Sequence, residues 1–287
     1  MTFEEFKKWV EKEIKNYLPD ELKDKEVVIH EISVLSGDYT GLTVRGDEQS
    51  VAPTANLERF YGEYCNGATK EELIKIIAEM VSYDSGASFD EEILRDYSLV
   101  KNSIFVRLCN ARTHSGLLRE VPHLLKCDMA VTCHVLVPVG GSAGSITVND
   151  EMLKEYGVSK EQLFEEAIKN SAGLLPASIG SLSEMTGIGP ENDEVFISIL
   201  TNEKRCYGAA AVLYPGVLEE LRLKVGDFYV IPSSVHEMII IPKSYKDDVD
   251  MMRKTLAASN RSEVSKADYL SDNVFIYEEK DKELKIA

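Results

Sequence analysis

The chain has 287 residues, of which 44% are hydrophobic and 28% charged, a composition that excludes a disordered protein. A net charge of −17 disfavours direct binding to nucleic acid, because phosphate contacts need a basic surface. No apolar run reaches the length of a membrane span, the charged N-terminus is not a secretory signal, and the five cysteines are scattered, so we expect a cytoplasmic protein with reduced thiols.

Capping boxes predict the first turns of three helices. In each box, a Ser or Thr and the Glu or Gln three residues later bond each other's backbone N–H groups, at Thr2–Glu5, Thr69–Glu72 and Ser159–Gln162. Apolar residues then recur at steps of three and four, as on the buried face of a helix. The same kind of pattern predicts shorter helices over residues 56–64, 90–99, 150–156, 215–224 and 249–256, with Asp150 as a cap.

Apolar runs between these helices predict strands. They are Val27–Leu35, Gly41–Arg45, Ile104–Leu108, Met129–Val139, Ser145–Val148, Glu194–Leu200, Gly208–Leu213, Phe228–Ile231, Met238–Ile241, Asn273–Tyr277 and Glu283–Ile286. Most of them lie close in sequence to an antiparallel partner, although helices intervene at a few places. Residues 112–125 give no clear prediction, and Leu175–Pro190 has the composition of a surface loop.

The segment FYVIPSSVHEMIIIP, residues 228–242, is predicted to form the centre of the fold. Its two apolar runs, Phe228–Ile231 and Met238–Ile241, are apolar at odd and even positions alike, which is typical of strands covered on both faces. Pro232 lacks a backbone donor and, with the two serines that follow it, predicts a polar turn at the rim of the sheet.

These elements predict an α+β fold, with a mixed or antiparallel sheet and helices packed against it. An internal echo favours two related lobes, because a strand, a short helix and a capping-box helix follow one another from Gly41 and again from Ser145. The lobes would be residues 1–125 and residues 126–287, the second carrying the central strands. The echo could instead arise by chance, because capping boxes and other helix signals are common. The chain could also form a single domain in place of two lobes.

Four side chains at the central turn are the candidate catalytic groups: Ser233, Ser234, His236 and Glu237. A hydroxyl beside an imidazole can form a nucleophile with its base. Adjacent residues of a regular strand face opposite ways, however, so His236 and Glu237 cannot both reach one site. Neither serine lies in a G-x-S-x-G motif. A hydrogen-bonded turn therefore fits these residues better than catalysis does.

Two other patterns contain residue types found in metal or cofactor sites, but their spacing does not match such sites. Cys127, Cys133 and His134 lie on or near one strand, with His114 and His123 upstream, but zinc sites usually contain close pairs such as C-x-x-C. The glycine-rich Gly140–Gly144 precedes a predicted strand, whereas a phosphate-binding loop precedes a helix. We therefore expect neither a metal nor a cofactor.

A short basic segment interrupts this acidic chain. It contains Arg107, Arg112, Arg119 and Lys126. These side chains either hold an anion or pair with carboxylates of the same chain. The 49 carboxylates favour pairing.

The order of these pieces resembles an uncharacterised family of Firmicutes proteins that is often found with mobile genetic elements. The likeness is carried by FEEFKKWV, GLTVR with SVAPTANLERFY, NDEMLKEYGVSKEQLFEEA, NEKRCYGAAAVLYP, the central FYVIPSSVHEMIIIP and LSDNVFIY, and so covers nearly the whole chain. A more distant likeness, in layout only, is to the YtpQ-type proteins of bacilli. The resemblance implies a bacterial, cytoplasmic protein and brings no activity, cofactor or catalytic residue.

The sequence thus leaves two classes of function. The first is a non-catalytic cytoplasmic interaction protein whose acidity attracts a basic protein, such as a nucleic-acid-binding host or defence protein. The second is a small-molecule hydrolase with its site near the Pro232–His236 turn. We favour the first, because no motif meets the geometric demands of catalysis.

Overall fold

The computed structural model describes residues 1–32, 39–45, 53–82, 91–139, 142–183, 197–245 and 248–287. The chain divides into two compact units, one containing residues 1–91 and the other almost all of residues 92–287. This division differs from the expected one near residue 126. Two strands that flank that position, β5 (His123–Lys126) and β6 (Met129–Val139), pair in one sheet from Lys126 opposite Met129, so residue 126 lies inside a unit.

The N-terminal unit combines an antiparallel sheet with three α-helices. Its sheet has the order β1-β2-β3, from β1 (Glu26–Ile32), β2 (Tyr39–Arg45) and β3 (Thr54–Asn56). Its helices are α1 (Phe3–Glu13), α2 (Leu57–Cys65) and α3 (Lys70–Val81), with the 3-10 turns η1 (Ile14–Asn16) and η2 (Asp20–Leu22). The capping boxes predicted for α1 and α3 are both present.

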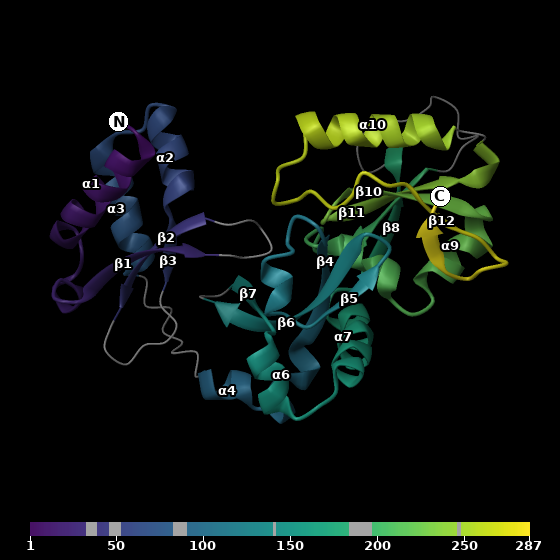
Figure 1. The fold of residues 1–287 in the computed structure, drawn as a ribbon, viewed down its shortest axis with the longest axis horizontal. Coiled ribbons are helices and arrows are strands. Elements are labelled where there is room, and N and C mark those ends of the chain that lie inside the picture. The colour runs from purple at the N-terminus through teal and green to yellow at the C-terminus, as the bar shows by residue number, and fades with distance from the viewer. Residues whose placement is uncertain (33–38, 46–52, 83–90, 140–141, 184–196, 246–247) are drawn as a thin grey trace. The chain divides into compact units, whose positions relative to one another are not determined.

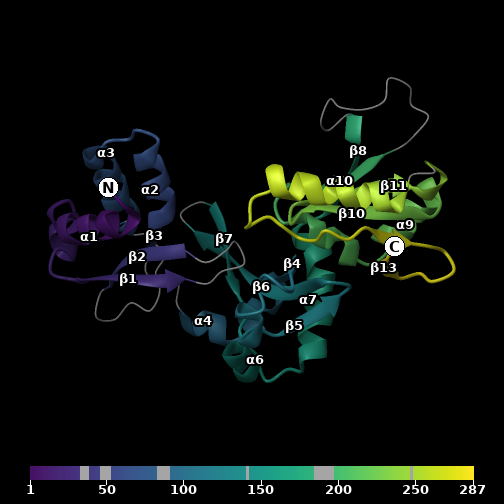
Figure 2. The same cartoon turned by 45° about the horizontal axis from the view of Figure 1, so that its top comes forward.

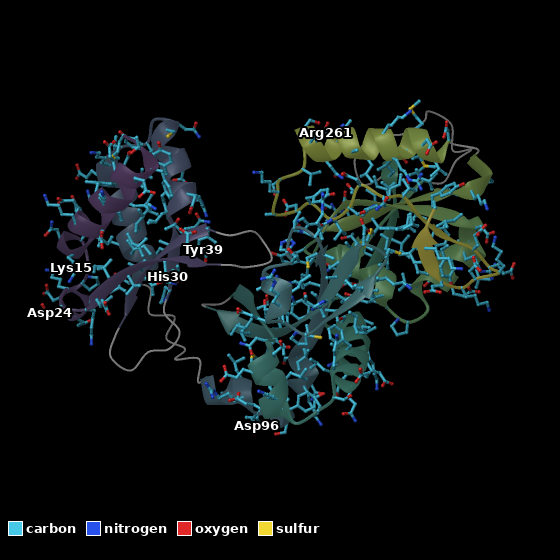
Figure 3. The ribbon with its side chains drawn as sticks, viewed as in Figure 1. Lys15, Asp24, His30, Tyr39, Asp96 and Arg261 are labelled. Carbon is cyan, nitrogen blue, oxygen red and sulfur yellow. The ribbon has the colours of Figure 1, made fainter. Side chains whose placement is uncertain are left out.

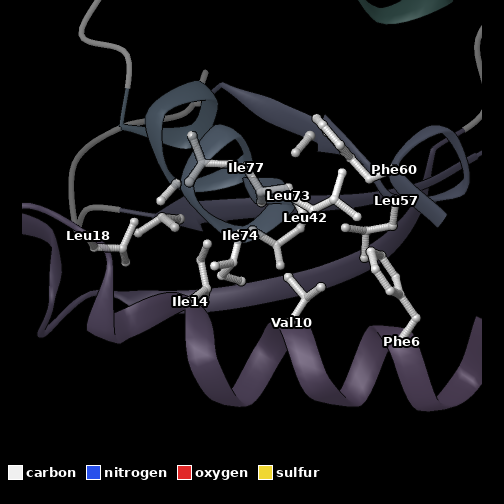
Figure 4. Packing of buried hydrophobic residues seen from close by; sticks show 14 residues of the cluster. Phe6, Val10, Ile14, Leu18, Leu42, Leu57, Phe60, Leu73, Ile74 and Ile77 are labelled. Carbon is white, nitrogen blue, oxygen red and sulfur yellow. The ribbon is translucent and has the colours of Figure 1, made fainter. Parts of the chain in front are cut away.

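The helices of this unit bury their apolar faces against the sheet. Phe6, Val10 and Ile14, at steps of four along the first helix, point into a core that the other helices and β2 share (Figure 4). Leu42 of β2 and Ile77 of α3 are completely buried in the same core. Among the described residues, the buried members of this core all lie between Phe6 and Val81, so the N-terminal unit is stabilised by its own side chains.

The second unit contains two sheets. A six-stranded antiparallel sheet has the order β13-β12-β10-β11-β9-β8, from β8 (Ala177–Ser181), β9 (Ser198–Asn202), β10 (Phe228–Ser234), β11 (Glu237–Pro242), β12 (Phe275–Tyr277) and β13 (Leu284–Ile286). The other sheet has β6 between β4 (Ile104–Asn110) and β5, and β7 (Ser142–Thr147) also pairs with β6. The helices are α4 (Glu91–Arg95), α5 (Tyr97–Val100), α6 (Asp150–Tyr156), α7 (Lys160–Leu174), α9 (Val217–Val225) and α10 (Val249–Ser262), with 3-10 helices η3 (Lys101–Ser103), η4 (Leu117–Arg119), η5 (Gly208–Leu213) and η6 (Lys243–Tyr245). The predicted α+β class is confirmed.

The predicted central strands, β10 and β11, pair in the middle of the six-stranded sheet. On one face, α10 packs Met252 against Ile241 and its half-buried neighbours, and the helix lies along the sheet in both views (Figures 1 and 2). On the other face, Phe228, Val230 and Ile240 are completely buried. Both faces are thus covered, one of them entirely, as the unbroken apolar runs predict.

Several predicted elements differ from the observed ones. Gly208–Leu213 is the 3-10 helix η5, because it lies between β4, β9 and β11 and is buried all round, so its apolar pattern cannot distinguish helix from strand. Residues 112–125 contain η4 and part of β5, and the predicted Leu175–Pro190 loop contains β8. Asn149, not Asp150, caps α6. Residues 33–35, 140–141, 184–190 and 194–196 of the predicted segments lie outside the described residues.

Candidate functional site

The β10–β11 turn holds its candidate side chains in local hydrogen bonds. A bulge lies between Pro232 and Ser234. The Ser233 hydroxyl donates to Glu237 Oε1 at 3.4 Å, and Ser234 Oγ accepts the backbone N–H of His236 at 3.1 Å. Among the hydrogen bonds of the described residues, none joins either serine to the His236 ring. The turn therefore brings the four candidates together without forming a hydroxyl–imidazole pair.

Both ring nitrogens of His236 are engaged elsewhere. Its Nδ1 lies 3.0 Å from the backbone N of Tyr207, which can only donate, so Nδ1 is an acceptor. Nε2 then carries the proton of the neutral ring and donates to Asp268 Oδ1 at 3.1 Å. Ser265 fixes the other oxygen of Asp268 at 2.8 Å. In this arrangement His236 has no free lone pair to take a proton from a serine, and it instead ties the turn to residues distant in sequence.

The β9–η5 loop, residues 203–207, is the partner of this turn. Asn202 brackets it by donating to the Cys206 carbonyl at 2.8 Å and accepting the Cys206 N–H at 3.3 Å. Tyr207 has a φ of 54°, a left-handed conformation that is uncommon for a residue with a side chain. Thr201 donates to the His236 carbonyl at 2.8 Å. These bonds fix both the loop and the direction of the Tyr207 ring.

The Tyr207 ring covers an arginine of the neighbouring sheet. The Arg107 guanidinium carbon lies 3.6 Å from the centroid of the Tyr207 ring and 5.4 Å from that of Phe105. Arg107 Nη2 donates to the Ser145 hydroxyl at 2.6 Å. We call these four residues the Arg107 cluster; it combines β4, β7 and the β9–η5 loop. The basic segment drew attention to Arg107 in the sequence, but no pattern pointed to Tyr207.

The basic segment pairs only in part with carboxylates of the same chain. Lys126 forms an ion pair with Glu283 at 3.3 Å, as pairing within the chain predicts. Arg107 takes part in no ion pair among the described residues, so it departs from the expectation that carboxylates neutralise the segment.

Two hydroxyl groups hold the ring of His134, one of the candidate metal ligands. His134 is completely enclosed, with Nε2 2.9 Å from the Thr132 hydroxyl and Nδ1 3.3 Å from that of Thr147. Burial, and then the charge of Arg107, lowers the pKa of His134 well below its ordinary value. Burial raises the pKa of the Cys133 thiol. In the part of the chain that the structure describes, no three His, Cys, Asp or Glu side chains are placed to hold a metal ion.

An open pocket of about 680 Å³ lies elsewhere in the second unit. It is lined by Arg95, Asp96, Tyr97, Ser98, Lys101, Glu155, Tyr156 and Glu166, of which Asp96 is labelled in Figure 3. Two of its carboxylates already have partners in the wall: Glu155 pairs with Arg95 at 2.7 Å, and Glu166 accepts from the Tyr97 hydroxyl at 2.6 Å. The Arg95–Glu155 ion pair neutralises two charges of the lining, and the Tyr97 hydroxyl holds the Glu166 carboxylate in the wall.

The N-terminal unit carries most of the net charge. Residues 1–91 contain 20 carboxylates and 10 lysines and arginines, a net charge of −10 out of −17. The ion pairs along its helices, such as Glu4–Lys7 at 2.7 Å and Glu71–Lys75 at 2.8 Å, are local and exposed, so each contributes little to stability. The remaining carboxylates give this unit a strongly negative surface.

Two apolar side chains interrupt that acidic surface. Ile76, on the outer face of α3, is 45% exposed, and Tyr17, just after η1, is 40% exposed. The pKa of Lys75 is raised mainly by its hydrogen bond to Glu71. Tyr17 also raises it, by a smaller amount, so the tyrosine lies near this part of α3. Exposed Glu72 and Glu79 flank Ile76 one turn away on the helix. An apolar centre with an acidic rim is an arrangement suited to a protein interface.

Comparison with known proteins gives one match. The model of the family described as "Family of unknown function (DUF5688)" matches residues 3–279. The chain belongs to DUF5688. No curated protein and no solved structure matches it, so the membership brings no activity or site residue. The described helices include none that is long and apolar enough to cross a membrane.

Proposed function

We propose that this DUF5688 member is a non-catalytic interaction protein whose N-terminal unit binds a basic protein. The observation that carries the proposal is the concentration of charge, with −10 of the net −17 in residues 1–91. A surface of one sign speeds association with a partner of the opposite sign and disfavours other partners. A nucleic-acid-binding protein of the host or of a defence system has the required basic surface. The setting we propose is the bacterial cytoplasm, alongside a mobile element.

The outer face of α3 supplies the centre of the proposed interface. Tyrosine is enriched among the residues that dominate binding energy, and an exposed isoleucine on the same unit adds apolar area that a partner can bury. Tyr17 and Ile76 provide these groups, and Glu72 and Glu79 provide the acidic rim. The charge thus sets the rate and the choice of partner, whereas the apolar pair sets how long the complex lasts.

A hydrolase at the β10–β11 turn has weaker support. A serine nucleophile needs a base that can accept its proton, and the base needs a third group to orient it. Asp268 could orient His236, but Nδ1 of that histidine is already occupied by the backbone N–H of Tyr207. The turn's hydrogen bonds favour a structural role.

The proposal is tested by capture of partners from a bacterial lysate with the full chain, at 0.1 M and at 1 M salt. We expect a basic protein that is retained only at low salt, because the Debye length falls from about 10 Å to about 3 Å over this range. Ile76→Ala and Glu79→Lys should each weaken its capture. The matched controls, Leu223→Ala and Glu165→Lys, change exposed residues on helices of the second unit and should not. Recovery of a neutral or acidic partner would contradict the proposal.

A further inference from the structure

The Arg107 cluster contains a positive charge that no carboxylate among the described residues neutralises. The chain has 49 carboxylates and 32 basic side chains, so an arginine has abundant partners available. None of the ion pairs among the described residues includes Arg107, and the groups that influence its pKa, apart from burial, are Tyr207 and Cys206. The side chain is half-buried, with its Nε enclosed, and burial lowers the pKa of Arg107. A buried charge without a counter-ion is costly, so its retention calls for an explanation.

The hydrogen bonds of Arg107 are also incomplete. A guanidinium has five N–H donors. Among the described residues, Arg107 donates from Nη2 to the Ser145 hydroxyl at 2.6 Å and interacts with the Tyr207 side chain. Its Nε–H is buried and has no acceptor. Such an orphaned donor in an otherwise well-bonded region is the sign of an acceptor that comes from outside the chain.

The cluster holds the guanidinium in a fixed orientation. Tyr207 lies over one part of the group at 3.6 Å, and Phe105 lies within cation–π range at 5.4 Å. Rings against a planar guanidinium leave its edge as the place where acceptors bind. The edge is the part that grips an oxyanion through parallel N–H···O bonds. The Ser145 hydroxyl, which accepts from Nη2, still has its own proton to donate to the same anion.

The surroundings allow an anion to approach. Cys206, adjacent to Tyr207, is exposed at the surface, and its thiol feels the positive charge of Arg107. The ring of His134, whose pKa responds to the charge of Arg107, is neutral because burial lowers that pKa, so Arg107 supplies the positive charge of the cluster. The nearby carboxylate of Asp268 is committed to His236 and Ser265.

We propose that the Arg107 cluster is a binding site for a small oxyanion, a phosphate or carboxylate group, which accepts hydrogen bonds from the Arg107 edge and the Ser145 hydroxyl. The site lies in the second unit and is independent of the proposed acidic interface. The same chemistry serves a phosphorylated and a carboxylated ligand, so the test separates the two.

The test uses the full chain labelled with ¹⁵N-arginine, titrated with sodium phosphate or with sodium acetate, at an ionic strength held constant with sodium chloride. The buried Nε–H of Arg107 should give a distinct resonance, assigned by its loss in Arg107→Lys. We expect phosphate, acetate or both to shift it with a dissociation constant of about 1 mM or tighter, the range accessible to a single anchored anion. The anion that binds more tightly identifies the ligand class.

Two variants complete the test. Arg107→Met should weaken binding of that anion at least tenfold, measured by calorimetry, whereas Arg261→Met, at the exposed end of α10 (Figure 3), should leave it unchanged. If Arg107→Met does not fold, the titration of the unmodified chain still shows whether an anion binds at Arg107. The proposal would be overturned if neither anion shifts the Arg107 resonance more than chloride does. It would also be overturned if Arg107→Met and the unmodified chain bind the anion equally.

Discussion

Gly208 shows how closely the backbone approaches itself at the start of η5. A Cβ atom there would lie 2.5 Å from the backbone N of Asn202 and 2.7 Å from the carbonyl of His236, and closer still to the Thr201 hydroxyl. Backbone atoms cannot move aside as a flexible side chain can. The glycine is therefore required for the loop that carries Tyr207 to pack beneath the β10–β11 turn.

Gly208→Ala should accordingly destabilise the protein by more than about 2 kcal/mol, because the added methyl forces η5 away from β9. The measurement is the midpoint of urea unfolding. Gly173→Ala is the matched control: this helical glycine has nothing within 4 Å of the added Cβ. It should stabilise α7 by about 0.5–1 kcal/mol. Equal midpoints for the two variants would contradict the close approach.

His134 makes the stability of the second unit depend on pH. Burial depresses its pKa in the folded state, whereas the unfolded ring titrates near its ordinary value of about 6.5. Below that value the unfolded chain binds a proton that the folded chain does not, so stability falls as the pH falls, until the folded pKa is reached. The slope from this one group is at most about 1.4 kcal/mol per pH unit.

His134→Gln should remove this contribution. The unfolding free energies measured by urea titration at pH 7 and at pH 5 should differ less for the variant than for the unmodified chain, because glutamine does not titrate. His123→Gln, a half-buried ring, serves as the control and should keep the wild-type dependence. If His134→Gln loses as much stability between the two pH values as the unmodified chain, the ring is not held neutral.

The candidate catalytic side chains give a third residue-scale prediction. Ser233→Ala, Ser234→Ala and His236→Ala should each leave partner binding and any activity within a few-fold of wild type, because the turn uses them to hold itself together. His236→Ala should cost about 1–3 kcal/mol of stability, since it orphans the backbone N–H of Tyr207. A loss of activity of about a thousandfold in a folded variant would be the size expected for a lost nucleophile or base.

At the scale of elements, β10 and β11 are the strands on which the second unit depends. Ile240 has no exposed surface, and it lies between β10 and β9 on the fully buried face of the sheet. Ile240→Asp should abolish soluble folding, because it places an unpaired charge there. Circular dichroism and solubility are the readouts. A soluble variant with the wild-type melting temperature would mean that this face is exposed.

The sequence predicted elements well where one local signal determines one structure. The capping boxes at Thr2, Thr69 and Ser159 are present, and the doubly apolar runs form the central strands. It failed at Gly208–Leu213, because burial on all sides removes the periodicity that separates a helix from a strand.

The candidate site was predictable only in part. The cluster of polar side chains in the turn could be seen in the sequence, but its partners could not, since Tyr207 and Asp268 lie about 30 residues away on either side of His236. The Arg107 cluster joins three segments spread over about 100 residues, and only the fold brings them together. Long-range pairing of this kind leaves no local pattern to read.

At the scale of the whole molecule, each of the two proposed binding roles belongs to a different unit. The N-terminal unit has its own core, from Phe6 to Val81, and carries a net charge of −10. The second unit holds the central sheet and the proposed anion site with a net charge of −7 on the larger part of the chain. Loss of anion binding in Arg107→Met should therefore leave partner binding unchanged, and loss of partner binding in Glu79→Lys should leave anion binding unchanged.

The central claim is that charge on the N-terminal unit drives association with a basic protein. The most direct measurement is the dissociation constant of the full chain with the purified partner, at 0.1 M and at 1 M salt. We predict at least a tenfold weakening at 1 M, and a smaller salt dependence for Glu79→Lys than for the control Glu165→Lys. Equal affinity at both salt concentrations, or the same salt dependence in the two variants, would contradict the claim and leave the acidity as a means of solubility alone.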